Sequence, residues 1–238
     1  MPLARAFVML RQLLAPACVV CGITAAHPSG SPVCAGCRDD YFNGNPPRCR
    51  LCANRLPAHG RDAGGVELCG RCLAHPPQFD ATWALADYAP PVDAMIAALK
   101  FHNRLDLGRA FGLLLAERLA RWQGDAVVAL PLSPERLRER GYNQAEEIAR
   151  PLARQLRRPL LRDALLRSRH CASQQGLRLA QRRTNVRGAF AAGVAAAGRD
   201  LLLVDDVLTS GSTLDAAAAA LKRAGARSVT NGVVARTP

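Results

Sequence analysis

The sequence predicts an α/β fold, in which a parallel sheet is flanked by helices, preceded by a small cysteine-rich module with the pattern of a double zinc ribbon. Eight of the nine cysteines form four Cys-x-x-Cys pairs before residue 73. From residue 82 onward, strand and helix patterns alternate, which is typical of a parallel sheet covered on both sides. The chain has 238 residues and is 49% hydrophobic, which is enough to bury a full core.

We expect two domains that meet at the linker His75-Pro76-Pro77. Residues 1–77 would hold an N-terminal helix over 4–14 and the double zinc ribbon, and residues 78–238 would form the α/β domain. Arg11 interrupts the first apolar stretch, so the ~7–15 apolar residues of a signal peptide are lacking. No run reaches the ~20 residues that span a bilayer. These features predict a cytoplasmic protein without a membrane span.

The paired cysteines predict structural zinc, because disulfides are rare in a reducing compartment. Two intervening residues let both thiolates of a pair reach one ion, and two pairs complete a tetrahedral site without an open position. Pairing in sequence order gives two sites, crossed pairing is the alternative, and the number of sites, one or two, stays open. The candidate ligands are Cys18, Cys21, Cys34, Cys37, Cys49, Cys52, Cys69 and Cys72.

The elements of the second domain follow from hydrophobic periodicity. Residues 200–204 form a continuous apolar run, typical of a strand buried on both faces. Strands are expected over 82–88, 126–130, 200–204 and 228–234, with short ones near 160–161, 164–166 and 189–191. Helices are expected over 91–101, 105–122, 133–139, 143–157 and 212–224.

The segment after the 200–204 strand carries the clearest chemistry. Asp205 and Asp206 follow the strand, and a loop of small hydroxyl residues leads into the next helix. Backbone N–H groups at a helix N-terminus bind phosphate, helped by the helix dipole. Two carboxylates would repel a phosphate but suit a diol and a divalent cation. The combination predicts a ribose phosphate ligand.

The charge distribution also indicates an anionic partner. The formal net charge is +13, and the segment 136–187 holds 14 arginines against four acidic residues. Such a block suits a polyphosphate, a phosphorylated small molecule or a nucleic acid.

The strand, the two acids and the loop resemble the 5-phosphoribosyl-1-pyrophosphate (PRPP) signature of type I phosphoribosyltransferases. The segments 99–102, 131–144 and 174–190, together with the cysteine module, resemble the ComF family over nearly the whole chain. ComF-like proteins join a zinc ribbon to a phosphoribosyltransferase-type domain and are linked to DNA uptake in competent bacteria. The stretch 174–188 is also similar to the mobile region of glutamine PRPP amidotransferases.

The resemblance implies roles for individual residues. Asp205 and Asp206 would hold the ribose hydroxyls, the loop would hold the 5-phosphate, and Mg²⁺ would accompany PRPP. The expected PRPP-binding residues are Asp205, Asp206, Thr209, Ser210, Gly211, Ser212, Thr213, Gly141 and Lys100. Catalysis would rest on cations at the pyrophosphate: Arg140, with Arg182 and Arg183 in a lid over 169–187.

Three functions fit these features. The first is a Mg²⁺-dependent phosphoribosyltransferase that releases pyrophosphate, with an unknown acceptor and a relation to DNA uptake. The second is a non-catalytic competence factor that binds single-stranded DNA, although aromatic residues for base stacking make up only 5% of the chain. The third is a PRPP-sensing scaffold that presents its zinc ribbon to DNA-uptake proteins. The sequence predicts neither the acceptor nor the oligomeric state.

Overall fold

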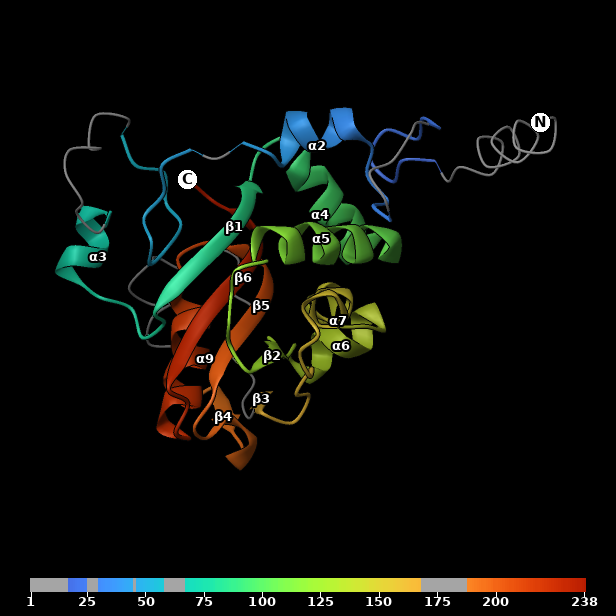
Figure 1. Cartoon of the computed structure of the whole chain (residues 1–238). Coiled ribbons are helices and arrows are strands. Elements are labelled where there is room, and N and C mark those ends of the chain that lie inside the picture. Colours follow the sequence, from blue (N-terminus) through green and yellow to red (C-terminus); the bar gives the residue numbers. More distant parts are fainter. Residues whose placement is uncertain (1–16, 25–29, 45, 58–66, 168–187) are drawn as a thin grey trace, which may run out of the picture. The chain divides into compact units, whose positions relative to one another are not determined.

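The computed structural model describes residues 17–24, 30–44, 46–57, 67–167 and 188–238 (Figure 1). The chain forms two compact units, residues 1–44 and 45–238. The expected helix over 4–14 and the expected lid over 169–187 lie outside the described residues. Among the described helices, none is long and apolar enough to cross a membrane.

The smaller unit is organised around its cysteines. The backbone N–H of Gly22 donates to the carbonyl of Cys18 at 2.8 Å, which closes the first Cys-x-x-Cys turn. Helix α2 (Ala35–Tyr41) begins directly after Cys34 and carries Cys37 on its buried side. Helix α2 was not predicted from the sequence, because a helix of seven residues in a cysteine-rich segment shows no apolar periodicity.

The larger unit contains a parallel sheet, as predicted, and its four strands lie in the order β1-β6-β5-β2 (Figure 1). Its strands are β1 (Ala81–Asp87), β2 (Ala126–Ala129), β5 (Asp200–Leu208) and β6 (Ser228–Arg236). The register of β5 and β6 runs from Asp200 opposite Ser228 to Leu208 opposite Arg236. Strand β5 continues beyond the expected end at residue 204, so both acidic residues lie within the strand.

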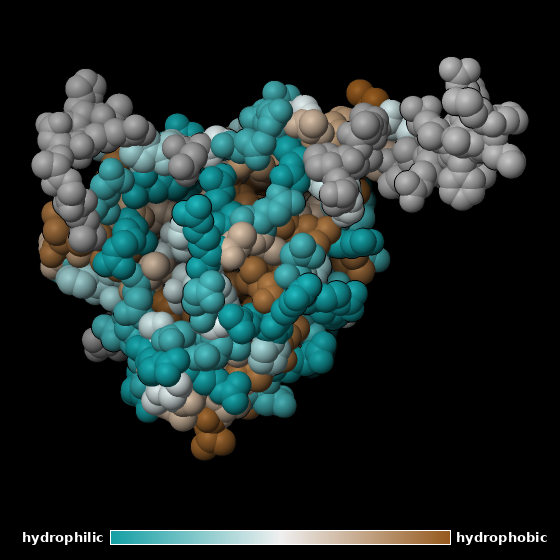
Figure 2. Space-filling model, in the orientation of Figure 1, coloured by the Kyte–Doolittle hydropathy of each residue, from teal (hydrophilic) through white to brown (hydrophobic). Residues whose placement is uncertain are grey.

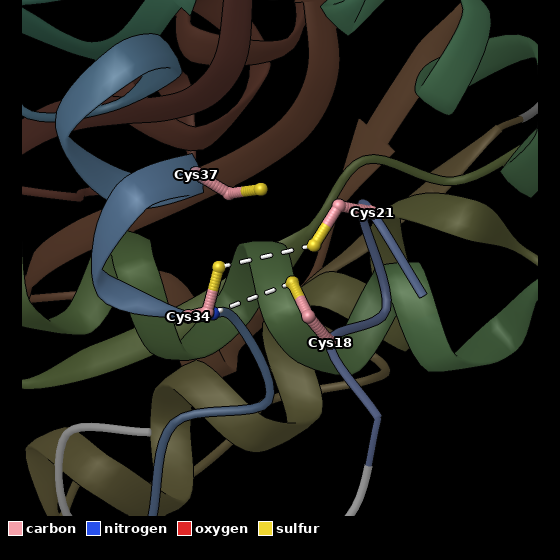
Figure 3. A group of neighbouring side chains, drawn as sticks. All are labelled: Cys18, Cys21, Cys34 and Cys37. Atoms are coloured by element: carbon pink, nitrogen blue, oxygen red, sulfur yellow. Dashed lines mark hydrogen bonds between the residues drawn. The ribbon is translucent and has the colours of Figure 1, made fainter. Parts of the chain in front are cut away.

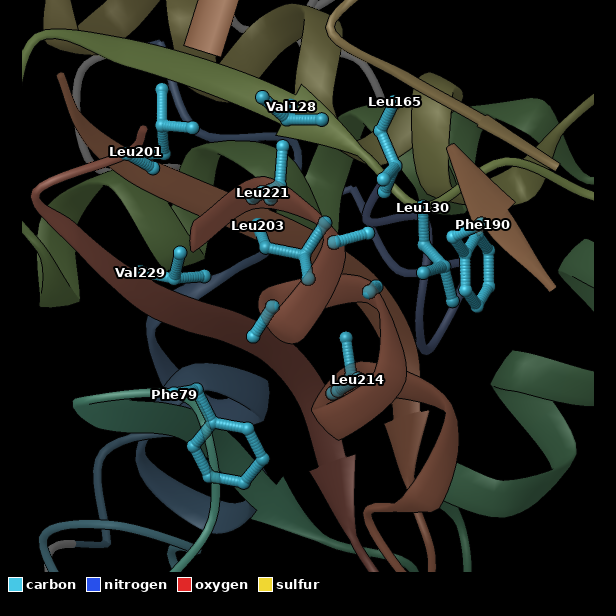
Figure 4. Packing of buried hydrophobic residues seen from close by; sticks show 14 of the residues in the cluster. Phe79, Val128, Leu130, Leu165, Phe190, Leu201, Leu203, Leu214, Leu221 and Val229 are labelled. Atoms are coloured by element: carbon cyan, nitrogen blue, oxygen red, sulfur yellow. The ribbon is translucent and has the colours of Figure 1, made fainter. Parts of the chain in front are cut away.

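Helices cover both faces of this sheet. On one face, α5 (Leu105–Arg118) contacts β1 and β6, while α7 (Gln144–Leu156) contacts β2 and β5. On the other face, α9 (Ser212–Arg223) packs Leu214 and Leu221 in one cluster with Leu201 and Leu203 of β5 (Figure 4). Because side chains alternate along a strand, Leu202 of β5 points to the α5 side. The apolar run of β5 is thus buried on both faces, as predicted.

Helix α5 approaches α7 closely at Gly112. A Cβ atom at this position would lie 2.3 Å from the carbonyl oxygen of Ile148. Only glycine allows this approach, which keeps α7 against the sheet. Helix α7 is preceded by α6 (Pro134–Arg140), and α5 is preceded by α4 (Val92–Phe101).

Two of the three expected short strands are present, within one residue of the expected positions, but they lie outside the parallel sheet. Strands β3 (Leu165–Arg167) and β4 (Phe190–Ala192) pair with each other, antiparallel, in a separate two-stranded sheet. Residues 160–161 form no strand, and Leu160 makes only an isolated bridge to Val127. A 3-10 helix over Val194–Ala196 (η1) was not predicted either. Segments this short have too few residues for periodicity to reveal their pairing partner.

The second group of cysteines belongs to the larger unit. Residues around it join the edge strand β1, where the backbone N–H of Thr82 donates to the carbonyl of Arg50 at 2.9 Å. Arg48 pairs with Asp87 at 2.8 Å at the other end of β1. Helix α3 (Gly70–Ala74) carries Cys72. The domain boundary expected at residue 77 stays a prediction, while the second ribbon and the sheet share one compact unit.

Candidate functional site

Asp205 and Asp206 lie near the carboxyl end of β5, where ligands of parallel sheets bind. Asp206 is 4% exposed, and its Oδ1 pairs with Nζ of Lys100, from the last turn of α4, at 2.8 Å. Its backbone N–H donates to Oδ1 of Asp205 at 2.8 Å. The Oδ2 atom of Asp206 is buried and has no hydrogen-bond partner within the described residues. The Oδ2 atom of Asp206 is therefore available to accept a hydrogen bond from a ligand or to bind a cation.

The electrostatics of this pair favour a bound cation or hydroxyl donors. Burial, and then the charge of Asp206, raise the pKa of Asp205 to about 8, and Lys100 and Arg167 lower it in part. Asp206 is buried and Asp205 is half-buried, and two adjacent carboxylates in such surroundings ionise together only when positive charge or donors compensate them. A divalent cation or the hydroxyls of a ribose supply that compensation.

The hydroxyl-rich loop joins β5 to α9. Gly211 has φ +82° and forms the N-cap of α9, a left-handed conformation that glycine adopts at little cost. The hydroxyls of Ser210 and Ser212 lie 3.0 Å apart, and Thr209 and Thr213 flank them. The loop thus gathers hydroxyl groups at the N-terminus of a helix of 12 residues, which suits a phosphate.

A basic region lies beside the acidic pair. The guanidinium carbon of Arg140 lies 5.0 Å from the ring centre of Phe101, and its Nη1 donates to Oε1 of Gln144 at 2.9 Å. Burial lowers the pKa of Arg140, and the charge of Asp206 raises it in part. Gly141 ends α6 with φ +76°. Lys100 therefore contacts the acidic pair directly, whereas Arg140 contacts Gln144 and Phe101 and acts on Asp206 through its charge.

Three further arginines bear on the candidate site: two that the sequence predicted and one that it did not. Arg182 and Arg183 lie outside the described residues. Arg167, at the end of β3, was missed: its charge acts on Asp205, and its guanidinium lies 5.4 Å from the ring centre of Phe190. No signal in the sequence separated Arg167 from the other arginines, because its position depends on the pairing of β3 with β4.

The eight paired cysteines form two clusters, and in each the sulfur atoms lie within 4.8 Å of one another. The first cluster comprises Cys18, Cys21, Cys34 and Cys37 (Figure 3), and the second Cys49, Cys52, Cys69 and Cys72. Pairing therefore follows sequence order, and the crossed alternative is not adopted. The sulfurs of Cys21 and Cys34 are 3.9 Å apart, and those of Cys52 and Cys69 are 3.6 Å apart. Four ligands at a Zn–S distance of ~2.3 Å would be ~3.8 Å apart, so both clusters fit zinc.

The two clusters share one electrostatic pattern. Burial opposes ionisation of Cys18 and Cys49, but backbone N–H donors of their own clusters outweigh it, lowering the pKa of Cys18 to about 6 and that of Cys49 to about 7. Burial, together with neighbouring cysteines, raises the pKa of Cys37 and Cys72 well above the ordinary range. A bound cation would compensate for that burial, as metal binding to cysteine requires.

The second cluster also borders the loop. A cavity of about 490 Å³ separates them. Arg71 and His75 line it from the ribbon side, and Ser210, Ser212 and Asp215 line it from the loop and α9. Hydrophilic residues cover much of the face of the molecule seen in Figure 2. The loop and the second ribbon thus line opposite sides of the same cavity.

Comparison with known proteins identifies both parts of the chain. A family model described as "Double zinc ribbon domain" matches residues 9–73, and one described as "Phosphoribosyl transferase domain" matches residues 143–238. "DNA utilization protein YhgH" of Escherichia coli K12 is 38% identical over 176 residues, which cover 71% of this chain and 78% of that protein. "Competence protein F" of Haemophilus influenzae is 30% identical over 213 residues, covering 85% and 90%.

Among solved structures, one match is the glutamine PRPP amidotransferase from B. subtilis complexed with ADP and GMP. It has a TM-score of 0.39 and 22% identity, and the match covers 53% of this chain and 25% of that one. The two matched families, with the long matches to YhgH and competence protein F, decide the assignment. The chain belongs to the ComF/YhgH family, and it joins a double zinc ribbon to a phosphoribosyltransferase domain.

Proposed function

We propose that this protein binds PRPP together with Mg²⁺ and transfers the ribose phosphate to an acceptor, releasing pyrophosphate, in the uptake or use of DNA. One observation carries the proposal: an adjacent pair of carboxylates, of which the buried Asp206 has an acceptor atom without a hydrogen-bond partner, lies two residues before a hydroxyl-rich loop at a helix N-terminus. The names of the relatives, a DNA utilization protein and a competence protein, support the biological setting. We expect the protein to act in the cytoplasm.

Each group would have a separate task in binding. Asp205 and Asp206 would accept hydrogen bonds from the ribose hydroxyls, and Lys100 would offset the buried charge of Asp206. The loop 209–213 would donate backbone N–H and hydroxyl groups to the 5-phosphate. Mg²⁺, when bound with PRPP, supplies positive charge at the pyrophosphate. Gly141 allows the chain to turn next to this group.

Transfer requires more than binding. The bond between C1 of the ribose and the pyrophosphate oxygen breaks, its electron pair leaves with pyrophosphate, and the acceptor nucleophile forms the new bond to C1. The developing charge on the leaving group needs nearby cations. Arg140 is proposed for this task, with Arg182 and Arg183 closing over the site and excluding water.

A non-catalytic single-stranded DNA-binding role is the second candidate, favoured by the arginine block 136–187. Part of that block already has acidic partners: Arg162 pairs with Glu146 at 2.8 Å, and Arg150 with Glu147 at 3.1 Å. These pairs reduce the charge available for phosphates, so PRPP binding is preferred. A PRPP-sensing scaffold would share the binding step and lack the transfer.

Calorimetric titration of the zinc-loaded protein with PRPP and Mg²⁺ tests binding. A variant with Asp205→Asn and Asp206→Asn should lose binding. Asp200→Asn is the matched control, because Asp200 lies at the opposite end of β5 and pairs with Arg227; it should bind like the wild type. Absence of binding by the wild type would overturn the proposal and leave salt-dependent DNA binding as the next measurement.

An acceptor screen that detects pyrophosphate release then separates enzyme from sensor. Arg140→Gln should reduce pyrophosphate release more than it reduces PRPP affinity. Binding without release for any acceptor would favour the sensing scaffold.

A further inference from the structure

The second cysteine cluster is hydrogen-bonded to the loop through Arg236, the last residue of β6. Arg236 is 6% exposed. Its Nε donates to the carbonyl of Cys52, a proposed zinc ligand, at 2.9 Å. Its Nη1 donates to the carbonyls of Thr209 at 2.9 Å and Leu208 at 3.2 Å. One buried guanidinium therefore connects a metal knuckle to the start of the loop.

A second arginine makes a parallel connection from the surface. Arg71 lies between Cys69 and Cys72, and its guanidinium donates to the carbonyl of Ser210. This residue is exposed, so its loss would not disturb the core. The loop is thus bonded to the ribbon on both sides of Thr209, from a buried and from an exposed position.

The charge of a filled zinc site would stabilise the buried connection. Four thiolates outweigh one Zn²⁺, so the centre is negative. A buried guanidinium is costly unless a negative group lies close. Zinc bound to Cys52 would also fix the position of the backbone carbonyl that accepts from Nε of Arg236, and an empty site would leave that acceptor less ordered.

We propose that zinc in the second cluster positions the loop for the 5-phosphate, with Arg71 and Arg236 as positioning residues, so that zinc at this site sets the affinity for PRPP. This inference rests on the proposed function. The first cluster, in the other compact unit, provides the comparison. Coupling between two ligands is reciprocal, so PRPP would also strengthen zinc binding in the second cluster.

The first experiment compares three arginine variants in the full-length, zinc-loaded protein. Arg236→Gln should weaken PRPP binding about tenfold, the typical effect of losing hydrogen bonds from a charged group. Arg71→Gln should weaken it severalfold and leave folding intact. Arg55→Gln is the control, because Arg55 lies in the same ribbon but pairs with Asp87. It should bind PRPP like the wild type.

Hydrogen exchange on the same proteins gives a readout that needs no ligand. Backbone amides of residues 209–213 should exchange faster in Arg71→Gln and Arg236→Gln than in Arg55→Gln. Equal exchange and equal PRPP affinity in all three variants would overturn the positioning role, even if the wild type binds PRPP.

The closing experiment measures zinc release to a chromogenic chelator, with and without PRPP and Mg²⁺. A variant with Cys18→Ser and Cys21→Ser lacks two ligands of the first cluster. The zinc release that it still shows is therefore that of the second cluster. PRPP should slow that phase and leave the first-cluster phase unchanged. If the wild type binds PRPP in calorimetry but neither phase slows, the inference fails and the proposed function stands. If the wild type binds no PRPP, the proposed function fails and the inference fails with it.

Discussion

The two cysteine clusters have the same ligands and the same pKa pattern, yet they lie in different surroundings. The first belongs to the unit of residues 1–44, and the second shares a compact unit with the sheet. Arg71 and Arg236 connect the second cluster to the loop after β5. The four cysteines of a cluster therefore determine how it can bind zinc, whereas the contacts of the surrounding chain determine which other part of the protein that zinc affects.

The largest difference should appear when one ligand is removed from each cluster. Cys37 and Cys72 occupy equivalent positions, both buried on short helices. Cys72→Ser should lower the free energy of unfolding of the larger unit by ~3 kcal/mol or more, because structural zinc supplies roughly 10–16 kcal/mol of binding free energy. Cys37→Ser should change it by less than ~1 kcal/mol.

Tryptophan fluorescence in a denaturant titration checks this prediction. Both tryptophans, Trp83 and Trp122, lie within residues 45–238, so the signal reports only the larger unit. If Cys37→Ser and Cys72→Ser lowered the free energy of unfolding of the larger unit equally, the two clusters would not differ in their contribution to its stability.

A smaller effect is expected where the second ribbon joins β1. The Asp87 side chain is 14% exposed and pairs with Arg48 and Arg55. Asp87→Asn should destabilise the larger unit by about 2–3 kcal/mol, since it leaves a half-buried guanidinium without its charge partner. Asp39→Asn, which alters an exposed hydrogen bond in the smaller unit, should have almost no effect on the same transition. If Asp87→Asn and Asp39→Asn lowered the free energy of unfolding equally, the stabilising role of the pairing of Asp87 with Arg48 and Arg55 would be contradicted.

The acidic pair should make the stability of the larger unit depend on pH. Burial raises the pKa of Asp205 to about 8, far above the ~3.9 of an unfolded Asp. Between these values the folded state holds the proton and the unfolded state does not, so rising pH favours unfolding. From pH 6 to pH 8, Asp205→Asn should therefore gain about 1–2 kcal/mol relative to the wild type.

Urea unfolding at pH 6, 7 and 8 measures this difference. The same pH dependence should persist in Cys37→Ser, because the acidic pair lies in the larger unit. A wild type and an Asp205→Asn variant that keep a constant difference across this range would contradict the prediction.

The smallest effect compares two glycines with left-handed backbones. Gly211 in the loop has φ +82°, Gly22 beside the first cluster has φ +74°, and neither has a neighbour that would clash with a Cβ. Alanine should cost about 1 kcal/mol at each, from backbone strain alone. Only Gly211→Ala should also weaken PRPP binding, by about fivefold if the whole strain falls on the loop. A similar loss of affinity in Gly22→Ala would show that the two regions are not independent.

Much of the larger unit was predictable because its signals are local. The apolar run of β5, the periodicity of α5 and α7 and the loop after the acids all lie within short stretches of sequence. The prediction of β5 was too short, because Asp205 and Asp206 were read as the end of the strand, whereas Asp205 still pairs with Val233 and Leu208 with Arg236 of β6. The pairing of β3 with β4 was missed, because three-residue strands carry no periodicity.

The candidate site was predictable only in part. The sequence placed the acids close to the loop, and it nominated Lys100, which pairs with Asp206, and Arg140, whose charge acts on Asp206. Arg167, Arg71 and Arg236 were not singled out, since each acts on residues far away in the chain. The functional roles of the expected site residues, Arg182 and Arg183 included, stay predictions.

The sequence by itself determined the eight candidate zinc ligands, the parallel α/β fold and the residue types of the loop, because spacing, periodicity and helix capping depend on neighbouring residues. Only the tertiary structure decided which cysteine pairs meet, that Lys100 reaches Asp206, and that Arg236 bonds to Cys52, 184 positions away. Such contacts depend on the packing of whole strands and helices against one another. They stabilise the fold jointly, so no short segment encodes them.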